Sequence, residues 1–253
     1  MTVKPKTALV TGASRGIGKA ICIELLNSGY SVVGLSRSIN TVDADLNRIA
    51  KENQVFYSGI RADVSKTQDY DKVYDFIKKE FGMLNLLVHN AGVAQMERKD
   101  VLEMSVDSYN RVMQINLFGP VFLTQKLFPL MKQLESGSIV FVSSISADVA
   151  SINRAEYCIS KAGLSMFAKV MAERLAKTKI NVFEIRPGII ETDMTKPVLN
   201  KYNKLINDGL VPKGRIGQPE DIALALRALV SGDFAYTNGL CLEISGGMQI
   251  RSL

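Results

Sequence analysis

Short apolar segments alternate with longer amphipathic segments along nearly the whole chain, and this alternation restricts the fold more than any other feature. The apolar segments are rich in β-branched and aliphatic residues and have the length of buried strands: residues 7–11, 31–35, 55–59, 84–88, 139–142, 181–185 and 240–244. Helical patterns lie between them, including residues 17–25, 65–81, 100–131 and 152–178. Strands buried on both faces and joined by helices form a parallel, doubly wound sheet. The sequence therefore predicts an α/β fold with a single domain over residues 1–253, because no linker or repeat marks a boundary.

A glycine-rich loop, residues 11–18, joins the first predicted strand to the first predicted helix. This arrangement directs several backbone N–H groups and the positive end of the helix toward one point, where an anion can bind. The spacing is Gly-x3-Gly-x-Gly and not the common Gly-x-Gly-x-x-Gly, and a tight connection is the alternative explanation. Because a strand and a helix flank the loop, we predict that it binds the pyrophosphate of a dinucleotide in a Rossmann-type fold.

The end of the second predicted strand indicates which dinucleotide binds. Sites for NAD usually place an acidic residue about 20 residues after the glycine loop, where it holds the ribose 2′-hydroxyl. Here Ser36 occupies that place and Arg37 follows it, while Arg15 lies inside the glycine loop. An arginine can pair with a 2′-phosphate through two N–H donors. We therefore expect NADP(H), the alternative being that both arginines are solvated surface cations.

Composition and charge narrow the functional class. The net charge of +6 suits anionic cofactors or acyl carriers, and no basic run interleaved with aromatic residues supports nucleic-acid binding. No apolar run reaches the ~20 residues of a membrane span, and residues 1–5 show no signal peptide. Cys22, Cys158 and Cys241 are far apart and lack the spacing of metal ligands. We expect reduced thiols, no metal site and a cytoplasmic location.

Four residues form a candidate catalytic group. Tyr157 and Lys161 are four apart on a predicted helix and share one face of it, and a nearby ammonium group is expected to lower the pKa of a phenol. Ser144 closes the fifth predicted strand, where ligands of open α/β sheets bind, and could donate a hydrogen bond to a carbonyl oxygen. Asn116 could hold a water that links Lys161 to solvent, or could simply interrupt a helix. A second Tyr–Lys pair, at positions 74 and 78, follows no such strand end and is assigned to a solvated helix face.

These motifs together resemble the short-chain dehydrogenase/reductase family over nearly the whole chain. Residues 11–18 match its cofactor loop, residues 90–92 its motif after the fourth strand, and residues 187–192 its segment facing the nicotinamide. Asn116, Ser144, Tyr157 and Lys161 match its catalytic tetrad. The residues that the loop and the resemblance together assign to the cofactor are Gly12, Ser14, Arg15, Gly16, Ile17, Gly18, Arg37, Asp63, Val64, Asn90, Ala91, Gly92, Tyr157, Lys161, Pro187, Gly188, Ile190 and Thr192.

The resemblance implies a mechanism. A hydride from the cofactor would reach a carbonyl carbon while Tyr157 protonates its oxygen; Lys161 would hold the nicotinamide ribose, Ser144 would orient the carbonyl and Asn116 would anchor a proton relay. His89, the sole histidine, stands where the family usually has asparagine, and we expect it to pack or form a hydrogen bond beneath the cofactor instead of acting in catalysis.

The substrate is less constrained. Residues 191–194, 214–223 and 239–248 most resemble bacterial 3-oxoacyl-acyl-carrier-protein reductases of fatty-acid synthesis, which implies a 3-oxoacyl thioester. Residues 191–212 are expected to form an apolar lid over the substrate, the alternative being an ordinary amphipathic surface helix. The resemblance implies basic residues that dock a carrier protein near positions 135 and 178, but this chain has Glu135 and Thr178 there. Lys132, Lys177 and Lys179 lie close by and could substitute as point charges. The alternatives are a reductase of a small ketone, sugar or hydroxysteroid, and an NADP(H)-binding redox sensor without turnover. The family resemblance also implies a homotetramer.

Overall fold

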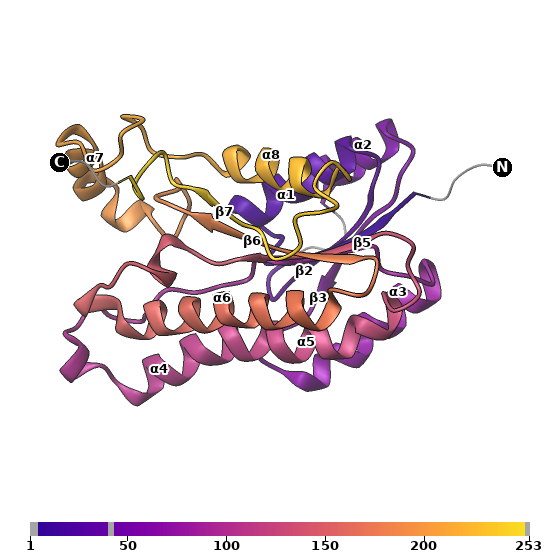
Figure 1. The fold of residues 1–253 in the computed structure, drawn as a ribbon, viewed down its shortest axis with the longest axis horizontal. Coiled ribbons are helices and arrows are strands. Elements are labelled where there is room, and N and C mark those ends of the chain that lie inside the picture. Colours follow the sequence, from indigo (N-terminus) through magenta and orange to yellow (C-terminus); the bar gives the residue numbers. More distant parts are fainter. Residues whose placement is uncertain (1–4, 40–42, 251–253) are drawn as a thin grey trace.

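The sheet has the predicted parallel, doubly wound form. A computed structural model describes residues 5–39 and 43–250, and within them seven strands form one sheet in the order β3-β2-β1-β4-β5-β6-β7. Every neighbouring pair is parallel. Figure 1 shows the strands running side by side through the middle of the molecule. They are β1 (Thr7–Thr11), β2 (Ser31–Ser36), β3 (Tyr57–Arg61), β4 (Leu86–His89), β5 (Gly137–Val142), β6 (Ile180–Pro187) and β7 (Cys241–Ile244).

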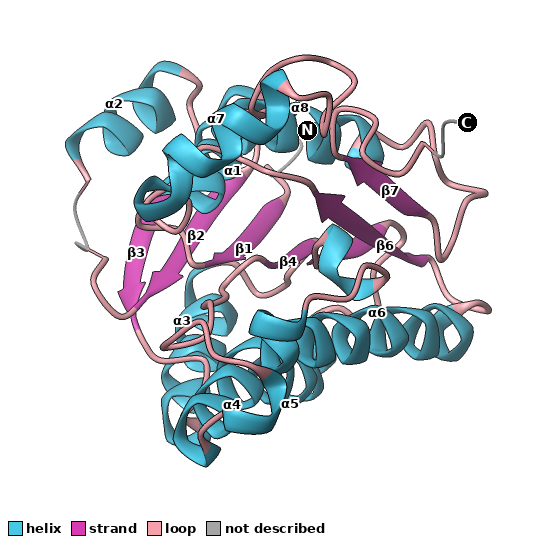
Figure 2. Cartoon of the chain, turned by 90° about the vertical axis from the view of Figure 1, so that its left-hand side faces the viewer, coloured by secondary structure: helices cyan, strands magenta, loops and turns pink. Residues whose placement is uncertain are grey.

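Helices cover both faces of this sheet. One face carries α1 (Gly16–Asn27), α2 (Ala44–Glu52) and α8 (Pro219–Val230), and the other carries α3 (Tyr70–Glu80), α4 (Val106–Met113), α5 (Gly119–Leu127) and α6 (Ala155–Leu175) (Figure 1). A further helix, α7 (Leu199–Asn207), lies beyond the carboxyl ends of the strands (Figure 2). Within the described ranges, no helix has both the length and the apolar composition needed to cross a membrane.

Two apolar cores follow from the alternation of side chains along each strand. Successive strand residues point to opposite faces, so Val10 and Phe183 pack into the core beneath α1 and α8, while Leu9 and Phe141 pack into the core beneath α3, α5 and α6. All four side chains are buried. Because both faces are covered, the strands read as nearly continuous apolar runs in the sequence.

Some predicted boundaries differ from the structure. The third strand begins at Tyr57 and not at Val55, because the N–H of Val55 bonds to the carbonyl of Ala50 and closes the end of α2. Gln54 adopts a φ of 56° in this turn. The fourth strand spans 86–89, where residues 84–88 were expected, and the N–H of Leu84 donates instead to the carbonyl of Leu130. The helix predicted over 152–178 is α6, which ends at Leu175 and follows a short 3-10 turn.

The helix expected over residues 100–131 is broken into several pieces. Its centre, Gln114–Phe118, is a π-helical turn between α4 and α5. Gly119 follows this turn at a close approach, since a Cβ there would lie 2.7 Å from the carbonyl oxygen of Val64. Pi-helical turns are rare and occur often at functional sites. This one contains Asn116, whose side chain is fully buried.

Candidate active site

One large cavity lies at the carboxyl edge of the sheet. Its volume is about 600 Å³, within the range typical of ligand sites. It opens where the chain order reverses between β1 and β4, the place where open α/β sheets bind ligands. Every residue that the sequence assigned to catalysis or to the cofactor lines this cavity, except Asn116. The tertiary structure thus brings segments from Gly12 to Thr192 into one site.

The glycine loop is fixed to the loop that follows β4. The hydroxyl of Thr11 donates to the carbonyl of Val88 (3.2 Å) and accepts from the N–H groups of Asn90 and Ala91 (3.0 Å each). In return, the amide of Asn90 donates to the carbonyl of Thr11 (2.9 Å). The N–H of Gly12 donates to the carbonyl of Leu35 at the end of β2 (2.7 Å). The cavity floor is therefore held by hydrogen bonds between strand ends.

The loop has the shape that close approach to a pyrophosphate needs. A Cβ on Gly18 would lie 2.1 Å from the carbonyl oxygen of Gly12, so no larger residue fits beneath the loop as it stands. Gly12 and Gly16 have φ values of 69° and 53°, in the left-handed region that favours glycine. The loop runs into the N-terminus of α1, where backbone N–H groups and the helix dipole attract an anion. The residues present thus fit a dinucleotide.

The cavity end beside β2 has no carboxylate at the close of that strand. Ser36 shares a hydrogen bond with Ser14 (3.1 Å), and Arg37 follows on the exposed rim. Arg15 also lies on the rim, and its guanidinium is 2.9 Å from the carboxylate of Asp193 in an exposed ion pair. Arg15 is therefore paired with the 191–212 segment, whereas Arg37 has no salt bridge within residues 5–39 and 43–250.

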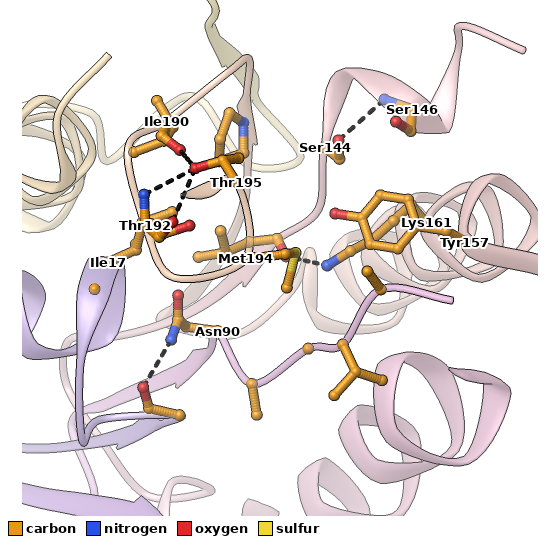
Figure 3. A pocket seen from close by; sticks show the side chains of 18 of the residues that line it. Ile17, Asn90, Ser144, Ser146, Tyr157, Lys161, Ile190, Thr192, Met194 and Thr195 are labelled. Carbon is orange, nitrogen blue, oxygen red and sulfur yellow. Dashed lines mark hydrogen bonds between the residues drawn. The ribbon is translucent and has the colours of Figure 1, made fainter. Parts of the chain in front are cut away.

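The other end of the cavity gathers Ser144, Tyr157 and Lys161, as Figure 3 shows. All three residues are buried. The ammonium of Lys161 donates to the carbonyl of Val142 (3.0 Å) and lies 5.7 Å from the centre of the Tyr157 ring. The hydroxyl of Ser144 accepts from the N–H of Ser146 (3.1 Å) and so caps the turn after β5. The predicted Ser, Tyr and Lys thus share one space.

The pKa of Tyr157 does not move in the direction expected from the sequence. Burial raises the pKa of this phenol, and the opposing effects of the Arg154 charge and the hydrogen bond to Ser144 do not reverse it. Burial also lowers the pKa of Lys161 to about 8, against a smaller upward effect of Glu184. The expectation that Lys161 lowers the pKa of Tyr157 is therefore wrong for this structure, because desolvation is the dominant effect. A raised pKa keeps Tyr157 protonated near neutral pH.

Asn116 lies behind the cavity wall and not on it. Its side-chain oxygen accepts from the N–H of Val93 (2.8 Å), and its amide donates to the carbonyl of Val93 (3.0 Å) and to the hydroxyl of Ser160 (3.1 Å). A Cβ on Gly92 would lie 3.4 Å from this oxygen and 3.5 Å from the ammonium of Lys161. Asn116 and Lys161 therefore flank Gly92, and the π-helical turn is what points Asn116 inward.

Arg154 is a cavity residue that the sequence reasoning missed. Its guanidinium carbon lies 4.5 Å from the centre of the Tyr157 ring. Its Nε is buried and has no hydrogen-bond partner among the described residues. Arg154 stands three positions before Tyr157, so helical spacing from the tyrosine could have signalled it.

A buried polar network supports the turn that carries Ser144. Glu184 on β6 accepts from the hydroxyls of Ser143 (2.5 Å) and Ser165 (2.9 Å) and from the Nε of Arg186 (2.7 Å). Arg186 also pairs with Asp148, just after the turn. These hydrogen bonds hold the pKa of Glu184 below its usual value although burial acts to raise it. The network fixes the end of β5 to β6 and α6.

His89 lies in the core and does not line the cavity. Its ring stacks on Phe141 with a centroid distance of 5.0 Å, and its Nε2 lies 2.7 Å from the hydroxyl of Thr124. That hydroxyl donates to the carbonyl of Pro120 (2.7 Å), so it accepts from an N–H on Nε2. Burial lowers the pKa of His89 to about 3, which keeps the ring neutral. Packing and hydrogen bonding account for this residue.

The 191–212 segment lies along the cavity. It contributes seven lining residues, namely Thr192, Asp193, Met194, Thr195, Val198, Tyr202 and Leu210. The hydroxyl of Thr195 donates to the carbonyl of Ile190 (2.7 Å) and accepts from the N–H of Thr192 (2.9 Å), as drawn in Figure 3. The start of the segment is thereby anchored, and Met194, Val198, Tyr202 and Leu210 line the cavity beyond it.

The fold and site define an oxidoreductase that uses a nicotinamide dinucleotide, and comparison with known proteins agrees. Residues 6–203 match the short chain dehydrogenase family. The 3-oxoacyl-[acyl-carrier-protein] reductase of Vibrio cholerae is 34% identical over 250 residues, which cover 99% of this chain and 100% of that protein. The chain belongs to the short chain dehydrogenase family.

Solved structures show the same similarity. A 3-oxoacyl-[acyl-carrier protein] reductase from Brucella melitensis, in complex with NAD, superposes with a TM-score of 0.94 at 35% identity over the full length of both chains. A candidate 2-deoxy-D-gluconate 3-dehydrogenase from Agrobacterium tumefaciens, with bound NADP, gives a TM-score of 0.86 at 30% identity over 98% of each chain. Relatives of this fold thus bind either dinucleotide.

Proposed function

We propose that this protein reduces the ketone of a 3-oxoacyl thioester to a secondary alcohol with NADPH. The observation that carries the proposal is that Ser144, Tyr157 and Lys161 lie buried at one end of the cavity that begins at the glycine loop. A bound nicotinamide supplies the hydride, with two electrons, to the carbonyl carbon. The similarity to 3-oxoacyl-[acyl-carrier-protein] reductases supports the thioester.

Tyr157 supplies the proton in this proposal. Its raised pKa means that the phenol enters the reaction protonated, as a reduction requires, and it passes the proton to the carbonyl oxygen as negative charge grows there. Ser144 closes the same space and orients the carbonyl by a hydrogen bond. Reprotonation of Tyr157 from solvent then completes the cycle, so that one ketone, one hydride and one proton give one alcohol.

Lys161 and Asn116 serve as binding and positioning groups. The ammonium of Lys161 lies at the cavity wall near Gly92, in a place to bind the hydroxyls of the nicotinamide ribose. The amide hydrogens of Asn116 are engaged by Val93 and Ser160, so any water that Asn116 holds must use a remaining oxygen lone pair. The proton relay through Asn116 stays a prediction.

The preference for NADPH rests on Ser36 and Arg37 at the end of β2. No acidic side chain closes that strand to hold a ribose 2′-hydroxyl, and the arginine that follows it supports a contact with a 2′-phosphate. The charge of Arg15 is partly neutralised by Asp193, so we expect Arg15 to contribute less than Arg37 to binding of the 2′-phosphate. Measured affinities for NADPH and NADH test this directly.

A carrier protein is a proposed partner, and the lysines that could dock it lie far from Tyr157. Lys132, Lys177 and Lys179 are exposed where β5 and β6 begin, at the edge opposite the cavity. From Tyr157 to the end of α6 at Leu175 is about 27 Å along the helix. A carrier docked on these lysines would therefore need an arm that spans about this distance to reach the cavity of the same chain.

We propose a homotetramer built on α5 and α6. These helices lie side by side in Figure 1, and their outward faces expose Phe122, Ile159, Met166 and Val170. Exposed apolar side chains in such a group mark an interface. Sedimentation at micromolar concentration tests the assembly, and a monomer would contradict it.

A second candidate substrate is a small polar ketone. The similarity to the Agrobacterium protein supports a sugar-type substrate on the same catalytic group. A polar ketone would be reduced by the same hydride and proton transfer as a 3-oxoacyl thioester. The two candidate substrates therefore differ only in how they fit the shape and polarity of the cavity next to the 191–212 segment.

The test is NADPH oxidation with acetoacetyl-CoA, run beside NADH. Turnover with NADPH and little with NADH supports both parts of the proposal. Tyr157→Phe should reduce turnover by at least about 100-fold and leave NADPH affinity within about threefold, because only the proton donor is lost. Tyr74→Phe, in the surface Tyr–Lys pair, is the matched control and should keep full activity. Substantial turnover by Tyr157→Phe would refute the assignment.

A further inference from the structure

Arg154 brings an unsatisfied donor to the cavity. Three buried side-chain atoms in the described residues lack a hydrogen-bond partner: Tyr57 Oη, Gln95 Oε1 and Arg154 Nε. Of these residues, only Arg154 lines the cavity. No salt bridge to Arg154 is present within residues 5–39 and 43–250. A buried donor without a partner is costly, and the cost is larger for a charged group. Because this Nε is shielded from the cavity, a ligand would pair with the terminal N–H groups of the same guanidinium.

The position of Arg154 places this donor beside the reacting group. Arg154 immediately precedes α6, and its guanidinium carbon lies 4.5 Å from the centre of the Tyr157 ring. The plane of a guanidinium offers several N–H donors in a fixed fork, suited to a carboxylate or carbonyl oxygen. Any group that Arg154 binds must therefore lie within a few bonds of the ketone that Tyr157 protonates.

The charges lining the substrate end have one sign. Arg98, Arg154 and Lys161 line the cavity there. The cavity-lining carboxylates lie elsewhere: Asp63 follows β3 at the adenine end, and Asp193 pairs with Arg15 and Lys196. The field near Tyr157 thus favours a substrate with an electronegative oxygen besides the ketone itself.

We propose that Arg154 is a substrate-binding residue that holds the C1 oxygen of a 3-oxoacyl substrate. This inference rests on the proposed ketone reduction and narrows its substrate class. The C1 oxygen lies roughly 3 to 4 Å from the ketone carbon, so the group that binds it must lie close to Tyr157, as Arg154 does. Two sources share this chemistry: the carboxylate of a free 3-oxo acid and the carbonyl of its thioester. We expect the carboxylate to bind Arg154 more strongly than the thioester carbonyl does, because both members of that pair are charged.

The test compares three substrates with the wild-type enzyme and Arg154→Gln. Acetoacetate carries a C1 carboxylate, its N-acetylcysteamine thioester carries a C1 carbonyl, and 2-pentanone has neither. We expect Arg154→Gln to lower kcat/KM by about 100-fold for acetoacetate and about tenfold for the thioester, mostly through KM, and by less than about threefold for 2-pentanone. Arg154→Lys, which keeps the charge but loses the fork, should fall between wild type and Arg154→Gln.

Arg48→Gln is the matched control, because it removes an arginine from the exposed face of α2, outside the cavity. This control should change kcat/KM for each of the three substrates by less than about threefold. Equal losses on all three substrates with Arg154→Gln, or equal losses with Arg48→Gln, overturn the proposal while leaving ketone reduction standing.

Binding separates this proposal from the proposed function. If the wild-type enzyme turns over none of the three ketones, ketone reduction fails, and calorimetry of acetoacetate with the enzyme–NADP⁺ mixture then decides the role of Arg154. Binding that is lost in Arg154→Gln and kept in Arg48→Gln supports it. Binding that is absent in the wild type, or unchanged in Arg154→Gln, overturns it. Thermal unfolding of each variant confirms that the protein is folded.

Discussion

The Gly18→Ala substitution tests whether the glycine loop acts through close backbone packing. Gly18 lies in α1 with ordinary helical conformation, so alanine would gain about 0.5–1 kcal/mol from helix propensity alone. The new Cβ would however lie 2.1 Å from the oxygen of Gly12 and 2.6 Å from the amide of Asn90, where ordinary contact begins at 3.4 Å. The loop must therefore retreat by about 1 Å. Because the obstacle is backbone, we place the packing cost near 3 kcal/mol.

The expected net loss in the free energy of unfolding is about 2 kcal/mol. For a chain of this length that corresponds to a fall in Tm of roughly 4–8 °C. NADPH affinity should fall at least about tenfold, because moving the loop breaks one or more charge-assisted hydrogen bonds to phosphate. Circular dichroism melts and NADPH fluorescence titration measure the two effects.

Gly163→Ala is the control for this prediction. Gly163 is also helical, in α6, but its Cβ would meet the end of the Leu117 side chain at 2.9 Å, and that side chain can rotate. We expect its Tm to stay within about 3 °C of the wild type and NADPH affinity to be unchanged. Wild-type NADPH affinity and Tm in Gly18→Ala, or equal damage by Gly163→Ala, would refute the reasoning.

Three further predictions follow from buried charge and from the cofactor end. Burial lowers the pKa of Lys161 to about 8, whereas the unfolded value is about 10.4, so the folded state carries a penalty that is full below pH 8 and fades toward pH 10. Lys161→Met should therefore raise the stability of the protein by up to about 3 kcal/mol at pH 7 and by much less at pH 10, and a difference independent of pH in urea unfolding would contradict this. Arg37→Glu should weaken NADPH at least about tenfold and affect NADH less, whereas Arg48→Glu, on the exposed face of α2, should change neither; equal effects on both dinucleotides in titrations would be incompatible with a 2′-phosphate contact. Glu184→Gln removes the buried carboxylate that faces Arg186 and should cost about 3 kcal/mol in urea unfolding at pH 7, and a loss below about 1 kcal/mol would show that the network contributes little.

The fold and most of the cavity could be predicted because they depend on local patterns. A continuous apolar run indicates a strand buried on both faces, and a glycine loop between strand and helix indicates an anion site wherever it occurs. All the predicted cofactor residues line the cavity: local pattern indicated those of the glycine loop and Arg37, and the family resemblance supplied the others. Strand boundaries were less certain: Val55 has the composition of a strand residue, but its N–H closes the end of α2.

The rest depended on neighbours distant in sequence. Asn116 points inward only because a π-helical turn interrupts the helix there. Its side chain is held by Val93, whose N–H donates to the amide oxygen and whose carbonyl accepts from the amide nitrogen. The pKa of Tyr157 is raised, where the Tyr–Lys spacing alone suggested a lowered value, because spacing reveals the charge but not the depth of burial.

The sequence by itself determined which residues carry the chemistry, because side-chain identity and local period are properties of the chain. Only the tertiary structure decided what each group faces. Arg154 reads as a surface cation until α6 packs beside β5 and β6 and leaves its Nε buried against Tyr157 without a partner. Solvation and pairing of a charge are set by the packing of several elements together, and no short stretch of sequence contains that information.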